Sequence, residues 1–346
     1  MPYKAFNKDF TCKGKQYEEN TTYEENGSEI CEEGVMHYCN NPFDVLNYYP
    51  LVNENGDISE FAEVEPLGNV YENKDKCATN KLRIGAKLGL KGFIKACIDF
   101  TLKKTKVETT GVDTKRDNRD CSQLAASGDY SQLAASGDYS KLASSGDSSK
   151  LAASGDSSKL AASGDSSKLA ASGYCSQLAA SGDYSQLAAS GYCSQLASSG
   201  DSSNLAASGY SSNLAASGDS SKLAASGYSS QLASSGDSSK LAASGDYSKL
   251  ASSGDYSKLA ASGDSSQLAA EGIHSVVMAA GHNSIAKAKI GSWITLAEWT
   301  KTDEINGKGN RIWIPKCVKT EYVDGERIKE DTFYKLVDGE FKEAED

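Results

Sequence analysis

The sequence predicts a mainly β fold, in which a four-sided β-solenoid of 18-residue coils lies between an N-terminal α+β domain and a C-terminal antiparallel β cap. Two observations predict the solenoid: a nine-residue motif repeats from Cys121, and several of its exchanges recur every eighteen residues. Two hairpin signals near the C-terminus predict the cap. The expected boundaries are 1–112 for the N-terminal domain, 113–120 for a linker, 121–290 for the solenoid and 291–346 for the cap.

The N-terminal region lacks the repeat and divides by charge. Fourteen acidic residues and no Lys or Arg lie between Glu18 and Glu72, whereas basic residues predominate from Lys74 to Lys106. Residues 81–104 have the composition of an amphipathic helix, and four basic residues spaced four apart would form a stripe along it: Arg83, Lys87, Lys91 and Lys95. The stripe is a surface for nucleic acid or an acidic partner, or else a solvated face near the domain's own acidic half. We favour the solvated face.

The central region is a nonapeptide array with a leucine at one fixed position. Leucine recurs at every ninth residue from Leu124 to Leu268, and Val277 and Ala286 continue the series, which gives nineteen units. The residues two before the leucine, and one and three after it, hardly vary, which indicates that they point inward. This pattern predicts a corner between the leucine and the following alanine, and a second turn at the glycine. Each nonapeptide would then contain two very short strands.

Exchanges within the array predict that two nonapeptides make one coil. Tyrosine replaces the aspartate after the glycine at four positions, each eighteen residues from the next: Tyr174, Tyr192, Tyr210 and Tyr228. An 18-residue unit of gene duplication would produce the same spacing. A helical array is the alternative, because Leu, Ala, Lys and Gln favour helices. However, Ser-Gly-Asp in every nine residues would leave helical pieces of about five residues, which are unstable alone.

The C-terminal region alternates apolar and polar residues, which is typical of antiparallel strands. Asp-Gly pairs at 324–325 and 338–339 are strong hairpin turns. Because the open end of a parallel solenoid invites strand addition, we expect this unit to cap it, with Trp293 and Trp299 covering the last coil. The same unit is a candidate contact between copies of the chain.

Composition argues against several classes of protein. The net charge of −11 and the pI of about 5.0 disfavour a nucleic-acid binder that works by bulk charge. No apolar run approaches the ~18 residues that a membrane span needs. The N-terminus shows no apolar signal segment, and nine cysteines at irregular spacing indicate free thiols in a reducing compartment. We therefore expect a cytoplasmic protein with no membrane and no nucleic-acid partner.

Three N-terminal segments resemble an uncharacterised domain of phage and prophage proteins: Tyr3–Phe6 (YKAF), Gly34–Pro42 (GVMHYCNNP) and Tyr48–Tyr49. The tail at 323–341 (VDGERIKEDTFYKLVDGEF) is similar to the ending of proteins of the same group, which often carry nonapeptide arrays. The resemblance implies a phage or prophage origin and a cytoplasmic protein made during infection, and it brings no known activity. The array is also similar in principle to pentapeptide-repeat proteins, quadrilateral β-helices of which some mimic DNA and block host enzymes. Its period is nine rather than five.

The sequence predicts no metal, no cofactor and no catalytic centre. The repeat has one carboxylate per nine residues and lacks the GGxG of calcium-binding β-rolls, so its aspartates are expected to stabilise turns. Cys31, His37 and Cys39 have a spacing that matches no paired zinc-ligand pattern. An enzyme is the alternative, with its centre in the N-terminal domain. Its candidate residues are His37, Tyr38, Tyr48, Tyr49 and an acid such as Glu60 or Glu63.

The surface of the array is its most informative feature. Residues 121–270 carry twelve Asp and eight Lys, but no lysine lies between 169 and 221. This gap and its edge contain five tyrosines that we predict to form a partner-binding stripe: Tyr174, Tyr184, Tyr192, Tyr210 and Tyr228. Stacking of tyrosines along the solenoid without any partner is the alternative.

The leading hypothesis is a non-catalytic, phage-encoded interaction protein. It would be a rigid repeat scaffold that binds, and blocks or sequesters, a host enzyme or defence complex. A structural or self-assembling virion component is one alternative, in which the tyrosine stripe or the cap joins copies of the chain. The enzyme centred near His37 is the other.

Overall fold

The computed structural model describes most of the chain. The described residues are 2–27, 35–53, 57–72, 76–105, 114–305, 307 and 309–345. The chain divides into two compact units: Met1–Ala188 with Gln195–Ser199 form unit 1, and Ala189–Ser194 with Gly200–Asp346 form unit 2. Strands hold 50% of the residues and helix 6%, which confirms the mainly β class.

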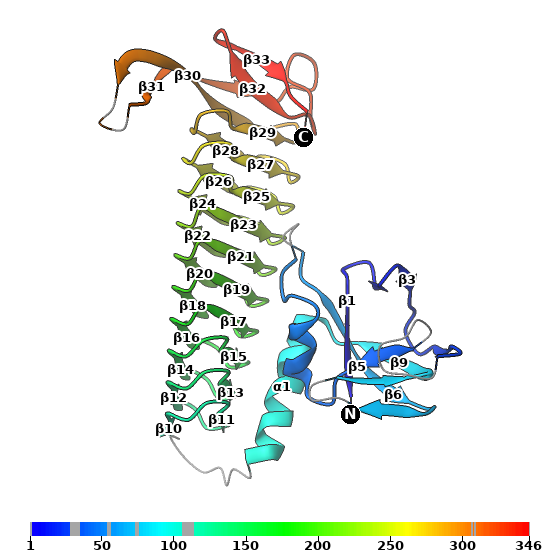
Figure 1. Cartoon of the computed structure of the whole chain (residues 1–346). Coiled ribbons are helices and arrows are strands. Elements are labelled where there is room, and N and C mark those ends of the chain that lie inside the picture. Colours follow the sequence, from blue (N-terminus) through cyan, green and yellow to red (C-terminus); the bar gives the residue numbers. More distant parts are fainter. Residues whose placement is uncertain are drawn as a thin grey trace. The chain divides into compact units, whose positions relative to one another are not determined.

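Both units contain part of a β-solenoid of about ten stacked coils, each of eighteen residues, as the sequence predicts (Figure 1). Each nonapeptide contributes one strand, and the strands belong alternately to two sheets, called sheet 1 and sheet 2 below. Sheet 1 contains β10 (Thr114–Asp117), β12 (Gln132–Ala135), β14 (Lys150–Ala153), β16 (Lys168–Ala171), β18 (Gln186–Ala189), β20 (Asn204–Ala207), β22 (Lys222–Ala225), β24 (Lys240–Ala243), β26 (Lys258–Ala261), β28 (Val276–Ala279), β30 (Trp293–Ile305) and β31 (Arg311–Tyr322). Sheet 2 contains β11 (Gln123–Ala126), β13 (Lys141–Ser144), β15 (Lys159–Ala162), β17 (Cys175–Ala180), β19 (Cys193–Ser198), β21 (Ser211–Ala216), β23 (Ser229–Ser234), β25 (Lys249–Ser252), β27 (Gln267–Ala270), β29 (Ile285–Ala288), β32 (Tyr334–Val337) and β33 (Glu340–Glu343).

A typical strand, β14, shows how the repeat folds. Leu151 and Ala153 are buried inside the coil, whereas Lys150 and Ala152 are exposed. The expected corner between the leucine and the next alanine is therefore wrong, because both residues lie in one strand with a strict period of two. The chain turns instead in residues 154–158, between β14 and β15. The sides of a coil are two strands and two turn segments.

The leucine column forms the centre of the solenoid. Every leucine of the fixed position from Leu133 to Leu268 is at most 2% exposed. In-register parallel pairing places each leucine on the leucine eighteen residues later, as in Leu151 on Leu169. Val277 continues the leucines of sheet 1 and Ala286 continues those of sheet 2, which confirms that the array survives where its sequence decays. This stack removes a continuous apolar core from water.

Part of the segment expected to be a linker belongs to the solenoid. Residues Thr114–Asp117 form β10, which pairs in parallel with β12. The sequence TKRD contains none of the repeat's leucine or alanine, so the repeat pattern alone gave no sign of this strand.

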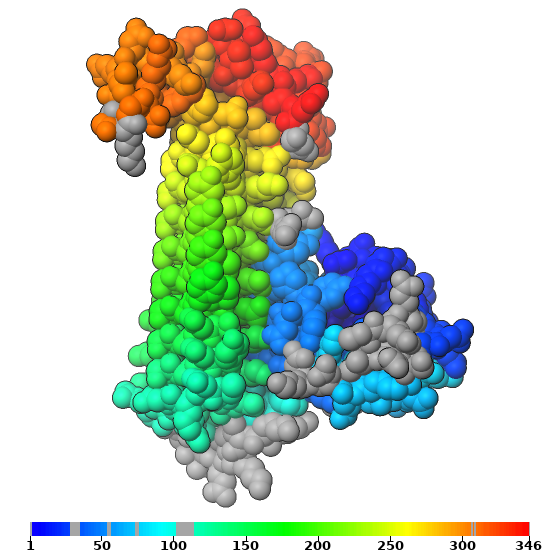
Figure 2. Space-filling model, in the orientation of Figure 1, coloured from blue at the N-terminus to red at the C-terminus, as the bar shows by residue number. Residues whose placement is uncertain are grey.

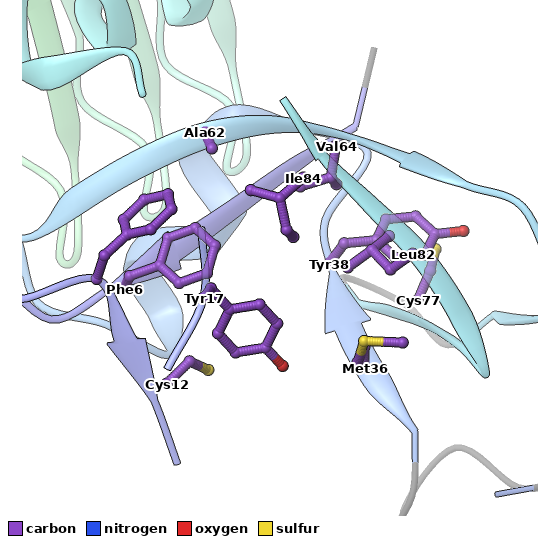
Figure 3. Close-up of a cluster of buried hydrophobic side chains, with 11 residues drawn as sticks. Phe6, Cys12, Tyr17, Met36, Tyr38, Ala62, Val64, Cys77, Leu82 and Ile84 are labelled. Carbon is purple, nitrogen blue, oxygen red and sulfur yellow. The ribbon is translucent and has the colours of Figure 1, made fainter. Parts of the chain in front are cut away.

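The N-terminal domain has the expected α+β composition and packs in unit 1. Its four-stranded antiparallel sheet has the order β1 (Tyr3–Phe6), β6 (Glu60–Pro66), β9 (Lys81–Lys87), β4 (Thr22–Glu24). The remaining elements are the hairpin β2 (Thr11–Cys12) and β3 (Lys15–Gln16), the sheet of β5 (Met36–Tyr38), β8 (Cys77–Thr79) and β7 (Val70–Glu72), the 3-10 helix η1 (Pro42–Asn47) and the helix α1 (Gly89–Thr105). Buried side chains that include Phe6, Met36 and Ile84 form its core (Figure 3).

The C-terminal region of unit 2 ends both sheets with antiparallel hairpins. β31 pairs with β30 at the end of sheet 1, and β32 joins β29 at the end of sheet 2 and pairs with β33. The expected antiparallel cap is therefore confirmed. Trp299 donates Nε1–H to the carbonyl of Ala280 at 2.9 Å, whereas Trp293 is 47% exposed and packs on Tyr322. Trp293 thus lies on the outer face of sheet 1 rather than over the coil interior.

Candidate functional site

The solenoid has two kinds of turn, which differ in the residue after the glycine. In an Asp turn, the residue after the aspartate has a positive φ, as in Ser220 at 57°. In a Tyr turn, the corresponding residue, such as Ser211, already belongs to the next strand. The four Tyr turns precede the six-residue strands β17, β19, β21 and β23, whereas the strand after an Asp turn typically has four residues.

Asp turns are held by two side-chain hydrogen bonds. Oδ1 of Asp219 accepts the backbone N–H of Asp237, one coil later, at 2.8 Å. The buried serine that follows each turn donates its hydroxyl to the glycine carbonyl of that turn, as Ser221 does to Gly218 at 2.9 Å. These bonds offset the cost of a non-glycine residue at positive φ.

Tyr turns lack this arrangement. Tyrosine carries no carboxylate, and the hydroxyls of Ser194 and Ser212 are buried without a hydrogen-bond partner among the described residues. The hydroxyl of Ser230 is 3.4 Å from the carbonyl of Gly227. In exchange the strand is longer, and the N–H of Ser211 donates to the carbonyl of Tyr192 at 2.9 Å. A Tyr turn therefore has fewer side-chain hydrogen bonds than an Asp turn, but more backbone pairing and an exposed ring.

Four tyrosine rings of unit 2 form one stacked row, called the tyrosine ridge below: Tyr192, Tyr210, Tyr228 and Tyr247. Successive ring centroids are 5.0, 5.2 and 5.2 Å apart, close to the ~4.8 Å spacing of paired strands. The rings are 43–53% exposed. Side chains of successive coils lie in columns on the solenoid surface (Figure 2). The ridge is a continuous aromatic edge along this part of the solenoid.

Of the five tyrosines predicted to form one stripe, Tyr184 lies in a different turn series from the other four. Tyr192, Tyr210 and Tyr228 belong to the ridge, whereas Tyr174 and Tyr184 belong to unit 1. Tyr174 lies in the Tyr turn before β17 and Tyr184 lies in the Asp turn after β17. Opposite ends of one strand carry these two rings, so including Tyr184 in a row with Tyr174 was wrong.

Sequence reasoning missed Tyr247 because it lies one position later in its repeat than the other three. It is the positive-φ residue of an Asp turn, with φ 55°, and its ring meets that of Tyr228 at an interplanar angle of 49°. The available signal was that Tyr247 follows Tyr228 by nineteen residues, one more than a coil.

The predicted basic stripe does not form along one helix. Residues Lys81–Lys87 are strand β9, and the helix α1 begins only at Gly89, which has a φ of +57°. Arg83 pairs with Glu65 at 3.5 Å, and the ammonium of Lys87 lies over the ring of Phe10. Lys91 and Lys95 are on α1, so the four-residue spacing spans two elements. The strand pairing of β9 between β4 and β6 overrides the helical pattern.

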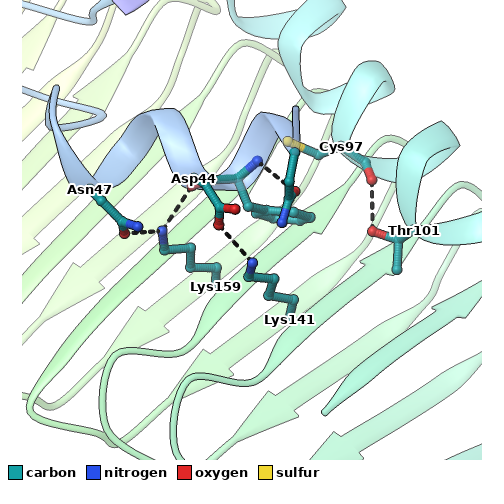
Figure 4. Close-up of polar contacts among 8 residues, drawn as sticks. Asp44, Asn47, Cys97, Thr101, Lys141 and Lys159 are labelled. Atoms are coloured by element: carbon teal, nitrogen blue, oxygen red, sulfur yellow. Dashed lines mark hydrogen bonds and ion pairs between the residues drawn. The ribbon is translucent and has the colours of Figure 1, made fainter. Parts of the chain in front are cut away.

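The N-terminal domain covers the outer face of sheet 2 in unit 1. Helix α1 packs on β11, β13 and β15, and two lysines of this face reach η1 (Figures 1 and 4). Lys141 forms an ion pair with Asp44 at 2.8 Å. Lys159 donates to the carbonyl of Phe43 and to Oδ1 of Asn47, both at 2.8 Å. Burial, followed by the nearby Lys141, lowers the pKa of Lys159 to about 8. These repeat lysines therefore serve contacts within the chain.

The N-terminal domain also contains a cavity of about 500 Å³. Four of the residues considered for an enzyme line it: His37, Tyr38, Tyr48 and Tyr49. The expected acids Glu60 and Glu63 do not, and among the described residues the acid in its lining is Glu25, which pairs with Lys15. Lys4 and Tyr17 also line it, and no feature of the sequence distinguished them from solvated or core residues.

No cluster of three or more potential metal ligands exists among the described residues. Cys31 lies outside those residues, while His37 and Cys39 lie on and directly after β5. In the part of the chain that the structure describes, no helix is long and apolar enough to cross a membrane.

Comparison with known proteins gives one result. Residues 1–96 match the family described as Domain of unknown function (DUF7666). This match covers the strands around the cavity and the first half of α1, and it leaves the solenoid and the cap unmatched. No curated protein and no solved structure matches the chain.

Proposed function

We propose that this chain is a non-catalytic interaction protein that binds a partner protein through the tyrosine ridge. The solenoid supplies a rigid scaffold, and the ridge supplies the contact surface. The observation that carries the proposal is the stack of Tyr192, Tyr210 and Tyr228, whose rings are 43–48% exposed on three successive coils.

The chemistry of the ridge suits a protein partner. Tyrosine is enriched at interfaces because its ring gives a large contact area with few rotatable bonds, while its hydroxyl remains available for hydrogen bonds. Prior stacking already limits the motion of the three rings, so binding costs less side-chain entropy than it would for isolated tyrosines. The residue that follows each of these tyrosines is small (Cys193, Ser211 or Ser229), so it does not cover the neighbouring ring.

Stability alone gives a weaker reason for the tyrosines. The Asp turn is available at the same place in the repeat, and the chain uses it at Asp201, Asp219 and Asp237 in the other turn series of unit 2. Each Tyr turn forgoes the carboxylate bond, and the turns at Tyr192 and Tyr210 also forgo the serine–glycine bond; each bond is worth about 1 kcal/mol. Ring stacking contributes about 0.5–1.5 kcal/mol. A binding role accounts for the choice of tyrosine on successive coils.

We propose a host enzyme or a host defence complex as the partner, and a phage genome as the origin. The support for both is the resemblance of the N-terminal and C-terminal segments to phage proteins. A partner that the ridge blocks or sequesters needs no catalytic group on this chain.

The test compares two variants of the full chain in quantitative affinity capture from host lysate. The double substitution Tyr192→Ser and Tyr210→Ser removes the centre of the ridge. The control is Tyr256→Ser, because this ring is 58% exposed in unit 2 but belongs to the other turn series and stacks on His274. We expect one partner to be captured by the wild type and by the control, and lost at least tenfold from the double variant. A partner that the double variant retains would contradict the proposal.

Sedimentation of the purified chain separates this function from self-assembly. If the ridge joins copies of the chain, the wild type sediments as an oligomer and the double variant as a monomer. If the chain is instead an enzyme with its centre near His37, His37→Ala should abolish its effect on host growth while partner capture persists.

A further inference from the structure

The cavity of the N-terminal domain has a charged residue in its wall. It is lined by Lys4 of β1, by Tyr17, by His37 and Tyr38 of β5, and by Tyr48 and Tyr49 after η1. Its volume of about 500 Å³ lies in the range of pockets that hold small molecules. Tyr17, Met36 and Tyr38 line it and also belong to the hydrophobic core of the domain (Figure 3).

Lys4 is the unusual residue of this wall. It is 6% exposed, and its ammonium donates one hydrogen bond, to the carbonyl of His37 at 2.9 Å. Among the described residues it has no ion pair; the ring centroids of Phe6 and Tyr17 lie 5.7 and 5.5 Å from it, and the thiol of Cys12 is a further polar neighbour. An ammonium has three donors, and the carbonyl of His37 and the thiol of Cys12 account for two of them, which leaves one for a ligand. A buried charge without a counter-ion is costly, and a bound anion would remove that cost.

Most of the other charged residues that line the cavity, among those the structure describes, are also basic. Lys13, Lys15 and Lys76 line it, and Glu25 is the acid among its lining residues. Because Lys15 pairs with Glu25, that carboxylate does not neutralise Lys4. The ammonium of Lys76 lies 5.5 Å from the ring centroid of Tyr48. A cationic ligand would meet repulsion here, whereas an anion would be attracted.

The cavity wall also contains several tyrosine hydroxyls, set among aromatic rings. Burial raises the pKa of Tyr3 and of Tyr38 to about 12, and raises the pKa of Tyr17 and Tyr49 as well. These hydroxyls therefore keep their protons at neutral pH. Protonated hydroxyls beside an ammonium favour carboxylate or phosphate oxygens, and the rings favour a flat or apolar body.

We propose that this cavity binds a small organic anion, a carboxylate or a phosphate ester on an aromatic or apolar body, and that Lys4 contacts its charged group. The cavity is in a different unit from the tyrosine ridge, so this site and the proposed partner binding can succeed or fail separately. No covalent step is part of the proposal.

Calorimetric titration of the full chain with three related probes tests the charge preference. The probes are benzoate, phenyl phosphate and benzylamine, which share one ring and differ in charge. We expect at least one of the two anions to bind and benzylamine to bind at least tenfold more weakly. Benzoate and phenyl phosphate together distinguish a carboxylate site from a phosphate site. Failure of both anions to bind, or equal binding of benzylamine, would overturn the proposal.

The variant Lys4→Met tests the residue. It keeps an unbranched side chain, one atom shorter, and removes the charge, so anion affinity should fall at least tenfold. Lys8→Met is the matched control, because Lys8 is 71% exposed, pairs with Asp57 and does not line the cavity. Its affinity should equal that of the wild type. Equal anion affinity in Lys4→Met and wild type would refute the role of Lys4.

A measurement on the unaltered chain covers the case in which Lys4→Met does not fold. Reductive methylation with formaldehyde and cyanoborohydride modifies accessible lysine amines, and mass spectrometry of peptides reports each site. The bound anion should slow methylation of Lys4 at least threefold and leave Lys8 unchanged, while benzylamine should protect neither. Protection of Lys8 to the same extent, or no protection of Lys4 at saturating anion, would show that the anion binds elsewhere.

Discussion

The two turn series of unit 2 have the same repeat, the same leucine core and nearly the same neighbours, yet they differ in backbone and surface. One series keeps aspartate after the glycine at Asp201, Asp219 and Asp237, and its turns are tied together by a carboxylate ladder. The other has tyrosine on three successive coils and presents stacked rings. Where tyrosine replaces aspartate, the next residue no longer has a positive φ and the following strand is longer. The hydrogen bond of the buried serine after the turn also changes.

This difference teaches that the repeat separates its structural and surface roles by position. Leucine and the inward serine and glycine are common to both series, and these residues form the core and the close contacts between coils. The residue after the glycine faces solvent in both, so it can vary without disturbing the leucine column. A function that needs a regular row of side chains can therefore be placed on this position.

The largest expected effect tests how closely the coils approach at each series. A Cβ at Gly227 of a Tyr turn would lie 1.6 Å from the carbonyl oxygen of Gly209, and one at Gly236 of an Asp turn 2.3 Å from that of Gly218. Both Gly227→Ala and Gly236→Ala should reduce the free energy of unfolding in denaturant by about 3 kcal/mol. The reduction should be greater for Gly227→Ala, because the closer contact needs a larger shift.

Gly307→Ala is the control for the glycine pair, since a Cβ there meets nothing within 4 Å. It should leave the free energy of unfolding unchanged within about 0.5 kcal/mol. A smaller loss at Gly227 than at Gly236 would mean that Tyr turns yield more easily than Asp turns, which contradicts the tighter stacking seen here.

The sequence predicted what depends on repetition and missed what depends on contacts across the chain. Period, coil length and the leucine core follow from spacing, because in-register pairing repeats one environment many times. The position of the corner did not follow, because the invariant alanine after the leucine was taken to be buried in every repeat. Ala152 of sheet 1 is exposed, whereas Ala143 of sheet 2 is buried on the face that α1 covers. Invariance in an array thus reports common ancestry of its units as much as burial.

The candidate sites show the same division. Three ridge tyrosines were found from their 18-residue spacing, whereas Tyr247 is shifted by one residue and was missed. The sequence pointed to this cavity only through His37 and the tyrosines near it. Lys4 was missed because it reaches the cavity and His37 only through folding of residues far apart in the chain. The helix expected over residues 81–104 forms only from Gly89 onward, because residues 81–87 pair between two strands. Pairing of this kind leaves no local pattern in the sequence.

A change of intermediate size converts one turn type into the other. Tyr210→Asp should allow the new carboxylate to accept the N–H of residue 228, as Asp237 accepts that of Asp255 at 2.8 Å. The gain of about 1 kcal/mol per hydrogen bond opposes the loss of ring stacking with Tyr192 and Tyr228, so the free energy of unfolding should change by less than about 1.5 kcal/mol. Near-ultraviolet circular dichroism should record the loss of the stack. A loss of stability above 3 kcal/mol would show that the rings hold the coils together, which supports the purely structural interpretation of the ridge.

The smallest expected effect separates the two buried serines that follow these turns. Ser221 donates its hydroxyl to Gly218 at 2.9 Å, whereas the hydroxyl of Ser212 is unpartnered within the described residues, and both side chains are 0% exposed. Ser221→Ala should therefore lower the free energy of unfolding by about 1 kcal/mol, because it removes a hydrogen bond and leaves a carbonyl unpaired. Ser212→Ala should be neutral or stabilising, because it removes a buried polar group that has already lost its water. Equal destabilisation by both substitutions in denaturant unfolding would mean that the Ser212 hydroxyl is hydrogen-bonded in solution, and that the Tyr turn differs from the Asp turn only in its carboxylate and its ring.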